Sequence, residues 1–215
     1  MKGVVIAGIG TDVGKTVVSA VVCEALSADY WKPVQSGIAD GPGDSQTVAA
    51  LLQCGPERVH PPAYAFKAPL SPHAAAALEG SSVTLERLVA PNTNSPLVVE
   101  LAGGVLVPLN DEHTNIDLVA RLGLPVLVVS RHYLGSINHT LLTLEALRAR
   151  EIAVMGVIFN GEELPDTERV IARLGQVPVL GRIPTFPELT AASIRAAAES
   201  LDLARVIHEA SLHEL

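Results

Sequence analysis

The sequence predicts an α/β fold in which a mostly parallel sheet lies between flanking layers of helices. Two observations support it: short aliphatic runs recur along the chain, and segments with helical spacing separate them. Strands that alternate with helices need crossover connections, and these join parallel strands. The chain has 215 residues, of which 48% are hydrophobic and 3% aromatic, so we expect a single domain over residues 1–215 with an aliphatic core.

Five aliphatic runs are expected to form strands that are buried on both faces. They cover residues 4–7, 97–101, 126–129, 154–159 and 177–180. Residues 30–32 form a weaker sixth candidate, which ends at Pro33 because proline cannot donate to a sheet ladder.

Six segments between these runs have the spacing or the end signals of helices, namely residues 15–27, 45–52, 116–122, 136–150, 167–174 and 190–208. Asp44 is a candidate N-cap of the second segment, and Gly175 is expected to terminate the fifth. The proline-rich stretch 37–96 interrupts the alternation. We expect loops and short helices there, and long irregular segments of this kind tend to carry function.

The composition disfavours several classes of partner. A formal net charge of −8 repels nucleic-acid phosphates and anionic lipids, and no apolar run reaches the ~18 residues of a membrane helix. Cys23 and Cys54, the only cysteines, lack metal-site spacing, as do His60, His113 and His132, so we expect no zinc. No signal-peptide core precedes the first strand, and we expect a cytoplasmic protein without a nucleic-acid or membrane partner.

The segment Gly8-Ile9-Gly10-Thr11-Asp12-Val13-Gly14-Lys15-Thr16 has the pattern of a phosphate-binding loop between a strand and a helix. Glycines let backbone N–H groups approach phosphate, and the helix N-terminus adds positive potential. Lys15 can reach the β- and γ-phosphates, and the Thr16 hydroxyl can ligate Mg²⁺. Five residues separate Gly8 from Gly14 where the usual pattern has four. The context still predicts ATP and Mg²⁺ binding in a P-loop NTPase-like three-layer fold.

Other side chains could converge on this loop, and each has an ordinary alternative. Lys32 would help to neutralise a transferred phosphoryl group, or it is a solvated strand-end lysine. Glu100, in an aliphatic strand, is a candidate Mg²⁺ ligand, and Asp44 is a second one unless it serves only as an N-cap. Asn160 either pairs with a purine or forms an Asn-Gly turn. Asp12 is either a turn-former or directed at a second substrate that is cationic or a proton donor.

Taken in chain order, these motifs resemble dethiobiotin synthetase, whose loop reads Gly-x-Asp-Thr-Glu-Val-Gly-Lys-Thr and also has five intervening residues. The chain departs from the family pattern at Gly10, Asp12 and Leu101. The matching segments are Gly8 to Thr16, Trp31-Lys32-Pro33-Val34-Gln35-Ser36-Gly37, Asp44, Pro69-Leu70-Ser71-Pro72-His73, Glu100-Leu101-Ala102-Gly103-Gly104, Leu134-Gly135-Ser136-Ile137-Asn138-His139, Asn160 and Gly181-Arg182-Ile183-Pro184.

The resemblance implies an ATP- and Mg²⁺-dependent cyclo-ligase of biotin synthesis. In that family 7,8-diaminononanoate takes up CO₂ as a carbamate, ATP phosphorylates the carbamate, and the second amine closes a cyclic urea. It also implies a homodimer in which the helix start at Gly135 receives the substrate carboxylate across the interface. The residues carried over are Lys32, Lys15, Thr11 and Asp12 for catalysis; Ser36, Gly135, Ser136 and Asn138 for the diamine; Gly10, Thr11, Asp12, Val13, Gly14, Lys15, Thr16, Val17, Asn160 and Pro184 for the nucleotide; and Thr16, Asp44 and Glu100 for Mg²⁺.

Two other functions remain open from the sequence. Amidating synthases of cobalamin assembly resemble this loop, but they usually carry an added glutaminase-like domain for which 215 residues leave no room. An ATPase switch of the partitioning or septum-site type is the rival from a different class. Its loop has an additional lysine that is missing around Gly10, and its tail is often basic, whereas residues 201–215 are mildly acidic. Both observations disfavour the switch.

Overall fold

A seven-stranded sheet forms the centre of the computed structural model, which describes residues 2–39 and 41–201. All of its paired strands run parallel. Their spatial order is β4 (Val59–His60), β2 (Asp29–Trp31), β6 (Leu97–Gly104), β1 (Gly3–Gly8), β7 (Val126–Arg131), β8 (Val154–Asn160) and β9 (Val179–Ile183).

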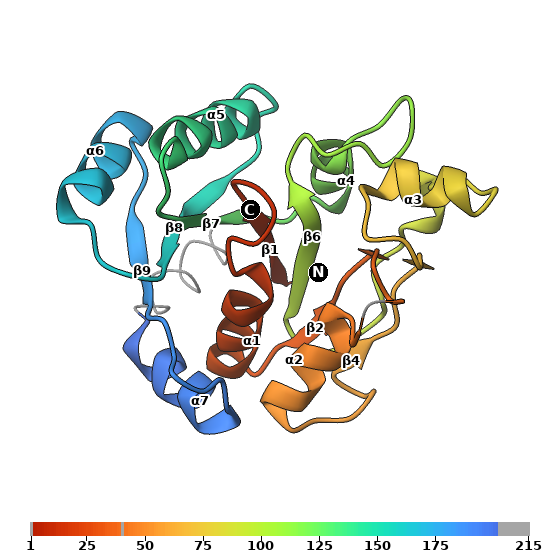
Figure 1. The fold of residues 1–215 in the computed structure, drawn as a ribbon, viewed down its shortest axis with the longest axis horizontal. Helices are drawn as coiled ribbons and strands as arrows, with labels where there is room; N and C mark the ends of the chain where they lie inside the picture. Colours follow the sequence, from red (N-terminus) through yellow and green to blue (C-terminus); the bar gives the residue numbers. More distant parts are fainter. Residues whose placement is uncertain (1, 40, 202–215) are drawn as a thin grey trace.

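Helices cover both faces of this sheet, as Figure 1 shows. One layer contains α1 (Lys15–Leu26), α2 (Asp44–Leu52) and α7 (Ala191–Ser200); the other contains α4 (Asn115–Leu122), α5 (Ser136–Arg148) and α6 (Pro165–Gly175). The predicted three-layer fold with a mostly parallel sheet is therefore confirmed. None of the helices among the described residues has the length and apolar character needed to cross a bilayer.

The proline-rich stretch folds against one end of the sheet. It contains the short helices α3 (Pro72–Leu78) and η1 (Leu85–Arg87), as expected, and also strands that were not predicted. These are β4 in the main sheet and β5 (Tyr64–Ala65), which pairs in parallel with β3 (Val34–Gln35) to form a small second sheet. Strands of two residues leave too short a hydrophobic pattern to be recognised in a sequence.

Several predicted boundaries differ from the structure, and three of them follow. Gly43, not Asp44, is the N-cap of α2, and Asp44 is the first helical residue. Gly175 is the last residue of α6, and the left-handed position follows at Gln176, with φ 45°. The last strand begins at Val179, after Pro178, whose missing N–H prevents it from donating to the sheet. Of the predicted helix 190–208, residues 202–208 lie outside the described part of the chain.

The order of the strands determines where a ligand can bind. β1 is central, with β6 on one side and β7 on the other, and the chain leaves its carboxyl end directly into the phosphate loop. In a parallel sheet the carboxyl ends of neighbouring strands meet at one edge, where the strand order changes direction. The loop, the end of β2 and the end of β6 are therefore brought together.

Candidate active site

The phosphate loop, Gly8 to Thr16, connects β1 to α1. Its backbone is left-handed at Asp12, with φ 56°, and at Gly14, with φ 92°. Left-handed residues between right-handed or extended ones can turn successive N–H groups toward one side and form a concave anion site. Gly8 lets the loop fold close to the strand, since a Cβ there would lie 2.9 Å from the Gly10 carbonyl oxygen.

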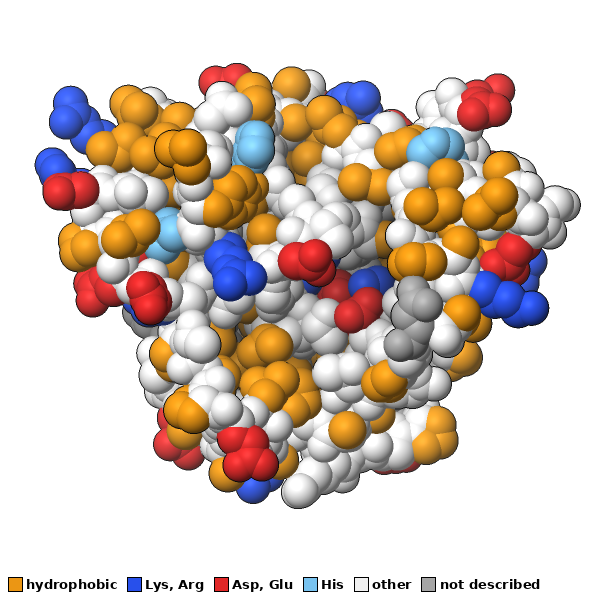
Figure 2. Space-filling view, viewed as in Figure 1, with side chains coloured by type: hydrophobic (Ala, Val, Ile, Leu, Met, Phe, Trp, Pro, Cys, Tyr) orange, Lys and Arg blue, Asp and Glu red, His pale blue; other side chains and the backbone are white. Residues whose placement is uncertain are grey.

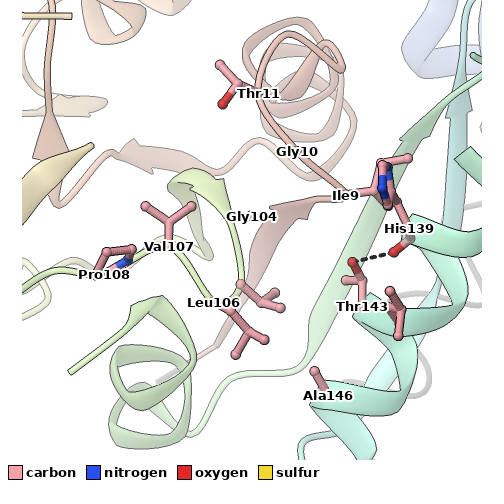
Figure 3. A pocket seen from close by; sticks show the side chains of 12 residues that line it. Ile9, Gly10, Thr11, Gly104, Leu106, Val107, Pro108, His139, Thr143 and Ala146 are labelled. Atoms are coloured by element: carbon pink, nitrogen blue, oxygen red, sulfur yellow. Dashed lines mark hydrogen bonds between the residues drawn. The ribbon is translucent and has the colours of Figure 1, made fainter. Parts of the chain in front are cut away.

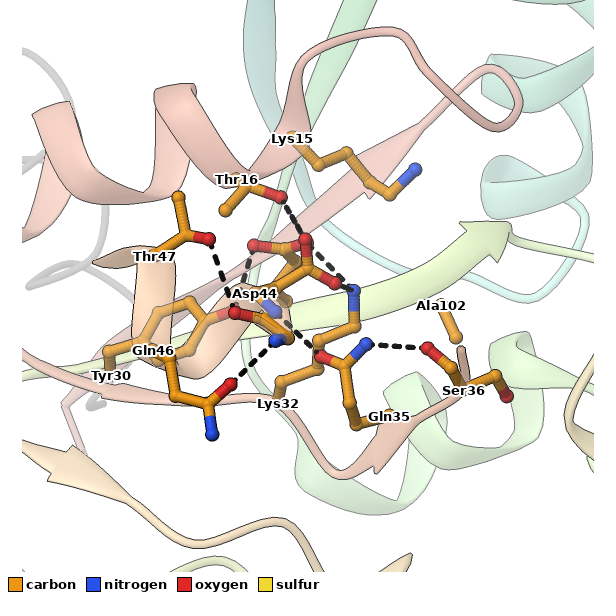
Figure 4. Close-up of polar contacts among 12 residues, drawn as sticks. Lys15, Thr16, Tyr30, Lys32, Gln35, Ser36, Asp44, Gln46, Thr47 and Ala102 are labelled. Atoms are coloured by element: carbon orange, nitrogen blue, oxygen red, sulfur yellow. Dashed lines mark hydrogen bonds and ion pairs between the residues drawn. The ribbon is translucent and has the colours of Figure 1, made fainter. Parts of the chain in front are cut away.

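Lys15, the first residue of α1, lies across its own loop. Its Nζ donates a hydrogen bond to the carbonyl oxygen of Gly10 at 2.8 Å, and its side chain extends away from Asp44 (Figure 4). Burial lowers the pKa of Lys15 to about 8, against the opposing effect of the Glu100 carboxylate. An anion bound in the loop would supply a countercharge to this ammonium, so the arrangement suits a phosphate group.

An ion cluster lies beside the loop, where Thr16, Lys32 and Asp44 (Figure 4) meet the carboxylate of Glu100. The Lys32 ammonium donates to Asp44 Oδ2 and, at 3.0 Å, to Glu100 Oε1. The Thr16 hydroxyl oxygen lies 2.6 Å from Asp44 Oδ1 and 3.2 Å from Glu100 Oε1. The side chains of Lys32 and Glu100 are only 7% and 1% exposed, so this cluster is largely shielded from water.

The charges of this cluster stabilise one another. Burial alone would lower the pKa of Lys32, but the neighbouring carboxylates of Glu100 and Asp44 raise it above its ordinary value. Burial would likewise raise the pKa of Asp44, whereas the Lys32 ammonium and hydrogen bonds hold it below its ordinary value. Lys32 is therefore a cation and Asp44 an anion at neutral pH.

Two residues that were not predicted hold the cluster in place. The hydroxyl of Tyr30 donates to Glu100 Oε2 at 2.9 Å, and the pKa of Tyr30 is raised by its burial and then by the Glu100 charge. Gln35 Oε1 accepts the backbone N–H of Asp44 at 3.0 Å, which fixes the start of α2. Tyr30 precedes Lys32 by two positions, and side chains at this spacing in an extended chain point to the same side. This spacing was the one signal in the sequence that could have placed Tyr30 at the site.

A cavity of about 360 Å³ joins the loop to the ion cluster. In Figure 2, basic and acidic side chains lie next to each other near the centre of the face in view. The predicted residues that line the cavity are Thr11, Asp12, Gly14, Lys15, Thr16, Val17, Lys32, Asp44 and Glu100, and Gly103 is added to them.

Other predicted site residues lie outside this cavity. Gly10 lines a second cavity next to Thr11, and Val13 is buried. Asn160 lies against the loop, where its Nδ2 donates to the Val13 carbonyl at 3.0 Å. The start of α5, with Gly135, Ser136 and Asn138, and Pro184 after β9 are likewise absent from the lining, as is Ser36 after β3.

The oxygen atoms around Thr16 are suited to a small hard cation. Thr16 Oγ1 lies within 3.2 Å of one carboxylate oxygen of Asp44 and one of Glu100. Among the residues that the structure describes, no group of three or more His, Cys, Asp or Glu side chains could hold a metal. Mg²⁺ needs fewer protein ligands than that, because it retains waters and takes oxygens from a bound phosphate. The residues present therefore fit Mg²⁺ together with a nucleotide.

Comparison with known proteins adds close relatives. A protein-family model described as an AAA domain matches residues 2–193. The ATP-dependent dethiobiotin synthetase BioD of Paramagnetospirillum magneticum is 48% identical over 90% of this chain and 93% of its own length, and that of Rhodopseudomonas palustris is 49% identical over 91% and 92%. The biotin biosynthesis bifunctional protein BioCD of Bordetella avium is 51% identical over 90% of this chain, which spans 42% of that longer protein.

Solved structures with low sequence identity share the fold. A ParA family ATPase from Chlorobium tepidum has a TM-score of 0.55 at 16% identity, and it covers 99% of this chain and 98% of its own. The cell division ATPase MinD of Pyrococcus furiosus has a TM-score of 0.51 at 14% identity, over 93% and 98% of the two chains. At these identities the likeness concerns the fold alone.

Proposed function

Because the chain belongs to the ATP-dependent dethiobiotin synthetase family, we propose that it joins 7,8-diaminononanoate and CO₂ at the expense of ATP to give dethiobiotin, ADP and phosphate. One observation carries this proposal: the phosphate loop, two lysines and two carboxylates meet at one cavity of about 360 Å³. A protein that only bound a nucleotide would need the loop but not the ion cluster. A ligase also needs cations beside the γ-phosphate, because they offset the charge of a second, anionic reactant.

The triphosphate is assigned to the loop. Its N–H groups and the start of α1 receive the phosphates, and the Lys15 ammonium leaves the Gly10 carbonyl to contact them. Thr16, Asp44 and Glu100 would hold Mg²⁺, which supplies charge neutralisation for the phosphate oxygens. Lys32 then stands on the side of the γ-phosphate that faces the second reactant, and Asn160 and Pro184 contact the adenine.

The reaction proceeds in three steps. One amine of the diamine adds to CO₂ and loses a proton, which gives a carbamate. A carbamate oxygen attacks the γ-phosphorus of ATP while the bond to the ADP oxygen breaks, and a carbamic–phosphoric anhydride forms. The second amine attacks the carbonyl carbon, phosphate leaves with the bonding electron pair, and the amine loses its proton as the cyclic urea closes.

This chain's residues assist each step. Thr11, Asp12 and Ser36 lie nearest to the diamine; the Asp12 carboxylate attracts a cationic amine, and the Ser36 hydroxyl is buried with no hydrogen-bond partner among the described residues. The Lys32 and Lys15 ammonium groups reduce the repulsion between a carbamate and a triphosphate. They also stabilise the charge that develops on the transferred phosphoryl group.

A second copy of the chain completes the substrate site in this proposal. A cavity of about 390 Å³ adjoins the loop at Gly10 and Thr11, and apolar side chains line most of it, among them Leu106 and Val107 (Figure 3). Leu142 of α5 also lines this cavity. An aliphatic chain with amines at one end fits such a lining. The start of α5 in a partner, with its Gly135, Ser136 and Asn138, would receive the carboxylate, since a helix N-terminus favours an anion.

Product analysis tests the activity. Purified protein is incubated with ATP, Mg²⁺, bicarbonate and the diamine, and ADP and product mass are followed. We expect one ADP for each dethiobiotin, and no ADP when either the diamine or bicarbonate is omitted. ATP turnover that is indifferent to both would remove the ligase and leave a nucleotide-switch ATPase.

Lys32→Met supplies the matched variant for this assay. We expect it to lose most turnover, because the ammonium beside the two carboxylates and the γ-phosphate is gone. Lys67→Met is the control, since Lys67 is exposed and absent from the cavity lining. Equal turnover in the two variants would contradict the role given to Lys32.

A further inference from the structure

Arg131, the last residue of β7, contacts the phosphate loop from outside the cavity. Its Nη1 donates to the carbonyl oxygen of Asp12 at 3.2 Å. Arg131 is paired in register with Asn160, the last residue of β8, whose Nδ2 donates to the carbonyl oxygen of Val13 at 3.0 Å. Two neighbouring strand ends therefore bind two successive carbonyl groups of the loop.

The orientation of a peptide carbonyl determines the orientation of the next N–H. In a planar trans peptide the carbonyl oxygen and the N–H of the following residue point in opposite directions. The Asp12 carbonyl belongs to the same peptide as the Val13 N–H, and the Val13 carbonyl to the same peptide as the Gly14 N–H. Binding both oxygens on the side of β7 and β8 turns both N–H groups toward the opposite side.

The loop needs this support because its conformation is unfavourable by itself. Asp12 has φ 56°, in the left-handed region that costs a residue with a Cβ roughly 1 kcal/mol or more. Gly14 is also left-handed but avoids this cost because it has no Cβ, and a Cβ there would overlap the side-chain amide of Asn160. A hydrogen bond from a guanidinium is stronger than one between neutral groups, so Arg131 can offset the cost at Asp12.

We propose that Arg131 and Asn160 form a carbonyl clamp that presets the Val13 and Gly14 N–H groups for phosphate. In this role both are positioning residues, and Arg131 acts without touching the substrate. The clamp rests on one part of the proposed function, namely that the phosphates of a nucleotide bind in this loop. It adds to that function a reason why the loop has its binding shape before the nucleotide arrives.

Binding of ADP and of inorganic pyrophosphate to Arg131→Met tests the clamp. We expect both ligands to bind about five- to tenfold more weakly than to the unaltered protein, and by the same factor, because the N–H groups contact phosphate and not the base. Arg131→Lys keeps a cationic donor and is expected to recover most of this loss. Arg169→Met is the control, since Arg169 is 69% exposed and pairs with Asp166 on its own helix.

A second measurement separates the clamp from a direct contact between Arg131 and phosphate. The clamp requires faster hydrogen exchange at the Val13 and Gly14 amides of Arg131→Met without any ligand, and a direct contact requires no such change. Three outcomes would overturn the clamp alone: Arg131→Met binds ADP as tightly as the unaltered protein does, Arg131→Met loses affinity for ADP but not for pyrophosphate, or amide exchange is unchanged. Absence of ADP binding by the unaltered protein would overturn the proposed function as well.

Discussion

Lys15 is placed for a bound ligand in a way that lowers the stability of the ligand-free protein. Lys15 is buried, and its ammonium contacts a carbonyl oxygen rather than a carboxylate. Burial accounts for the lowered pKa, about 8, and the ordinary value is 10.5. A group whose charged form is disfavoured in the folded state lowers the stability of that state wherever it stays charged. Phosphate binding would remove this penalty.

Lys15→Met should separate activity from stability. We expect the variant to lose at least about a hundredfold in turnover, because the cation at the transferred phosphoryl group is missing. The ligand-free variant should nevertheless unfold at the same temperature as the unaltered protein or higher. Turnover and thermal unfolding are measured on the same preparation, and a variant that keeps full activity would contradict the role of Lys15.

The stability difference between these two proteins should depend on pH. Because the folded-state pKa of Lys15 lies below the unfolded value, the unfolded chain binds more protons between pH 8 and 10.5, and the unaltered protein gains stability as pH rises through this window. The advantage of Lys15→Met, up to about 3 kcal/mol at pH 7, should therefore shrink toward pH 10. Urea unfolding at pH 7, 9 and 10 measures it, and an advantage that grew with pH would contradict the burial of a charged lysine.

Glu100→Gln tests the metal site. The glutamine keeps the size of the side chain but removes the charge that faces Lys32 and Thr16. We expect the Mg²⁺ concentration for half-maximal activity to rise roughly tenfold or more, since Mg²⁺ prefers anionic oxygen ligands. Glu86→Gln is the control, because Glu86 is 79% exposed on η1. An unchanged Mg²⁺ titration would make Glu100 a structural partner of Lys32 and Tyr30 only.

At the scale of elements, the carboxyl end of β6 is held by α4. Asn115, the first residue of α4, is buried, and its Nδ2 donates to the carbonyl oxygens of Ala102 and Gly104 at 2.8 and 2.9 Å. These carbonyls flank Gly103, which lines the cavity and has φ 74°. One amide thus fixes the strand end that carries Glu100.

Asn115→Ala and Asn115→Asp together test this connection. Both substitutions remove the side-chain donor, and each carbonyl that is left buried and unpaired lowers the free energy of unfolding by about 1–3 kcal/mol. We therefore expect both variants to lower the free energy of unfolding and the turnover. Asn115→Asp keeps the volume, so a variant as stable and active as the unaltered protein would mean that filling space, not hydrogen bonding, is the role of Asn115.

The elements around the phosphate loop could be predicted because local signals determine them. A buried strand, glycines, and an amphipathic helix that begins at Lys15 lie within one short stretch. The exact start of α2 was missed, because one of its two determinants is not local. Gln46, three residues away, accepts the N–H of Gly43, but Gln35, which accepts the N–H of Asp44, belongs to another segment.

In the ion cluster, too, the sequence predicts the residues but not their contacts. Lys32, Asp44 and Glu100 could each be suggested as site residues. Glu100 lies in an aliphatic strand, where a buried charge is costly unless it is paired, and Lys32 was expected at the carboxyl end of a strand on the same edge as the loop. Their mutual contacts, and the hydrogen bond from Tyr30, depend on the position of β2 beside β6, which no local pattern specifies. The contact of Arg131 with the loop depends in the same way on β7 lying beside β1.

At the scale of the whole molecule, apolar side chains remain exposed beside the second cavity. Leu134 is fully exposed, and Leu106 and Leu142 are 58% and 54% exposed. Leu106 and Leu142 line the cavity, and Leu134 directly precedes Gly135 at the start of α5. Exposed apolar groups of this kind next to a site indicate a contact surface. The proposed homodimer would cover it and bring a second α5 to the substrate.

Leu142→Arg should weaken that dimer. A buried, unpaired guanidinium in an apolar contact is costly, so we expect the dissociation constant measured by sedimentation to rise at least about tenfold. The KM for the diamine should rise with it, while the KM for ATP stays close to that of the unaltered protein. Leu174→Arg on α6 is the control, with a leucine that is 60% exposed and absent from the cavity lining. Unchanged sedimentation would contradict this interface.

The most direct test is a crystal structure with Mg²⁺ and a non-hydrolysable ATP analogue. We expect the β- and γ-phosphates within the Gly8 to Thr16 loop, with the Lys15 ammonium moved from the Gly10 carbonyl to phosphate. The metal should contact Thr16, and Lys32 should have turned from Asp44 toward the γ-phosphate. Phosphates found elsewhere on the molecule, or bound with Lys32 still between Asp44 and Glu100, would contradict the account.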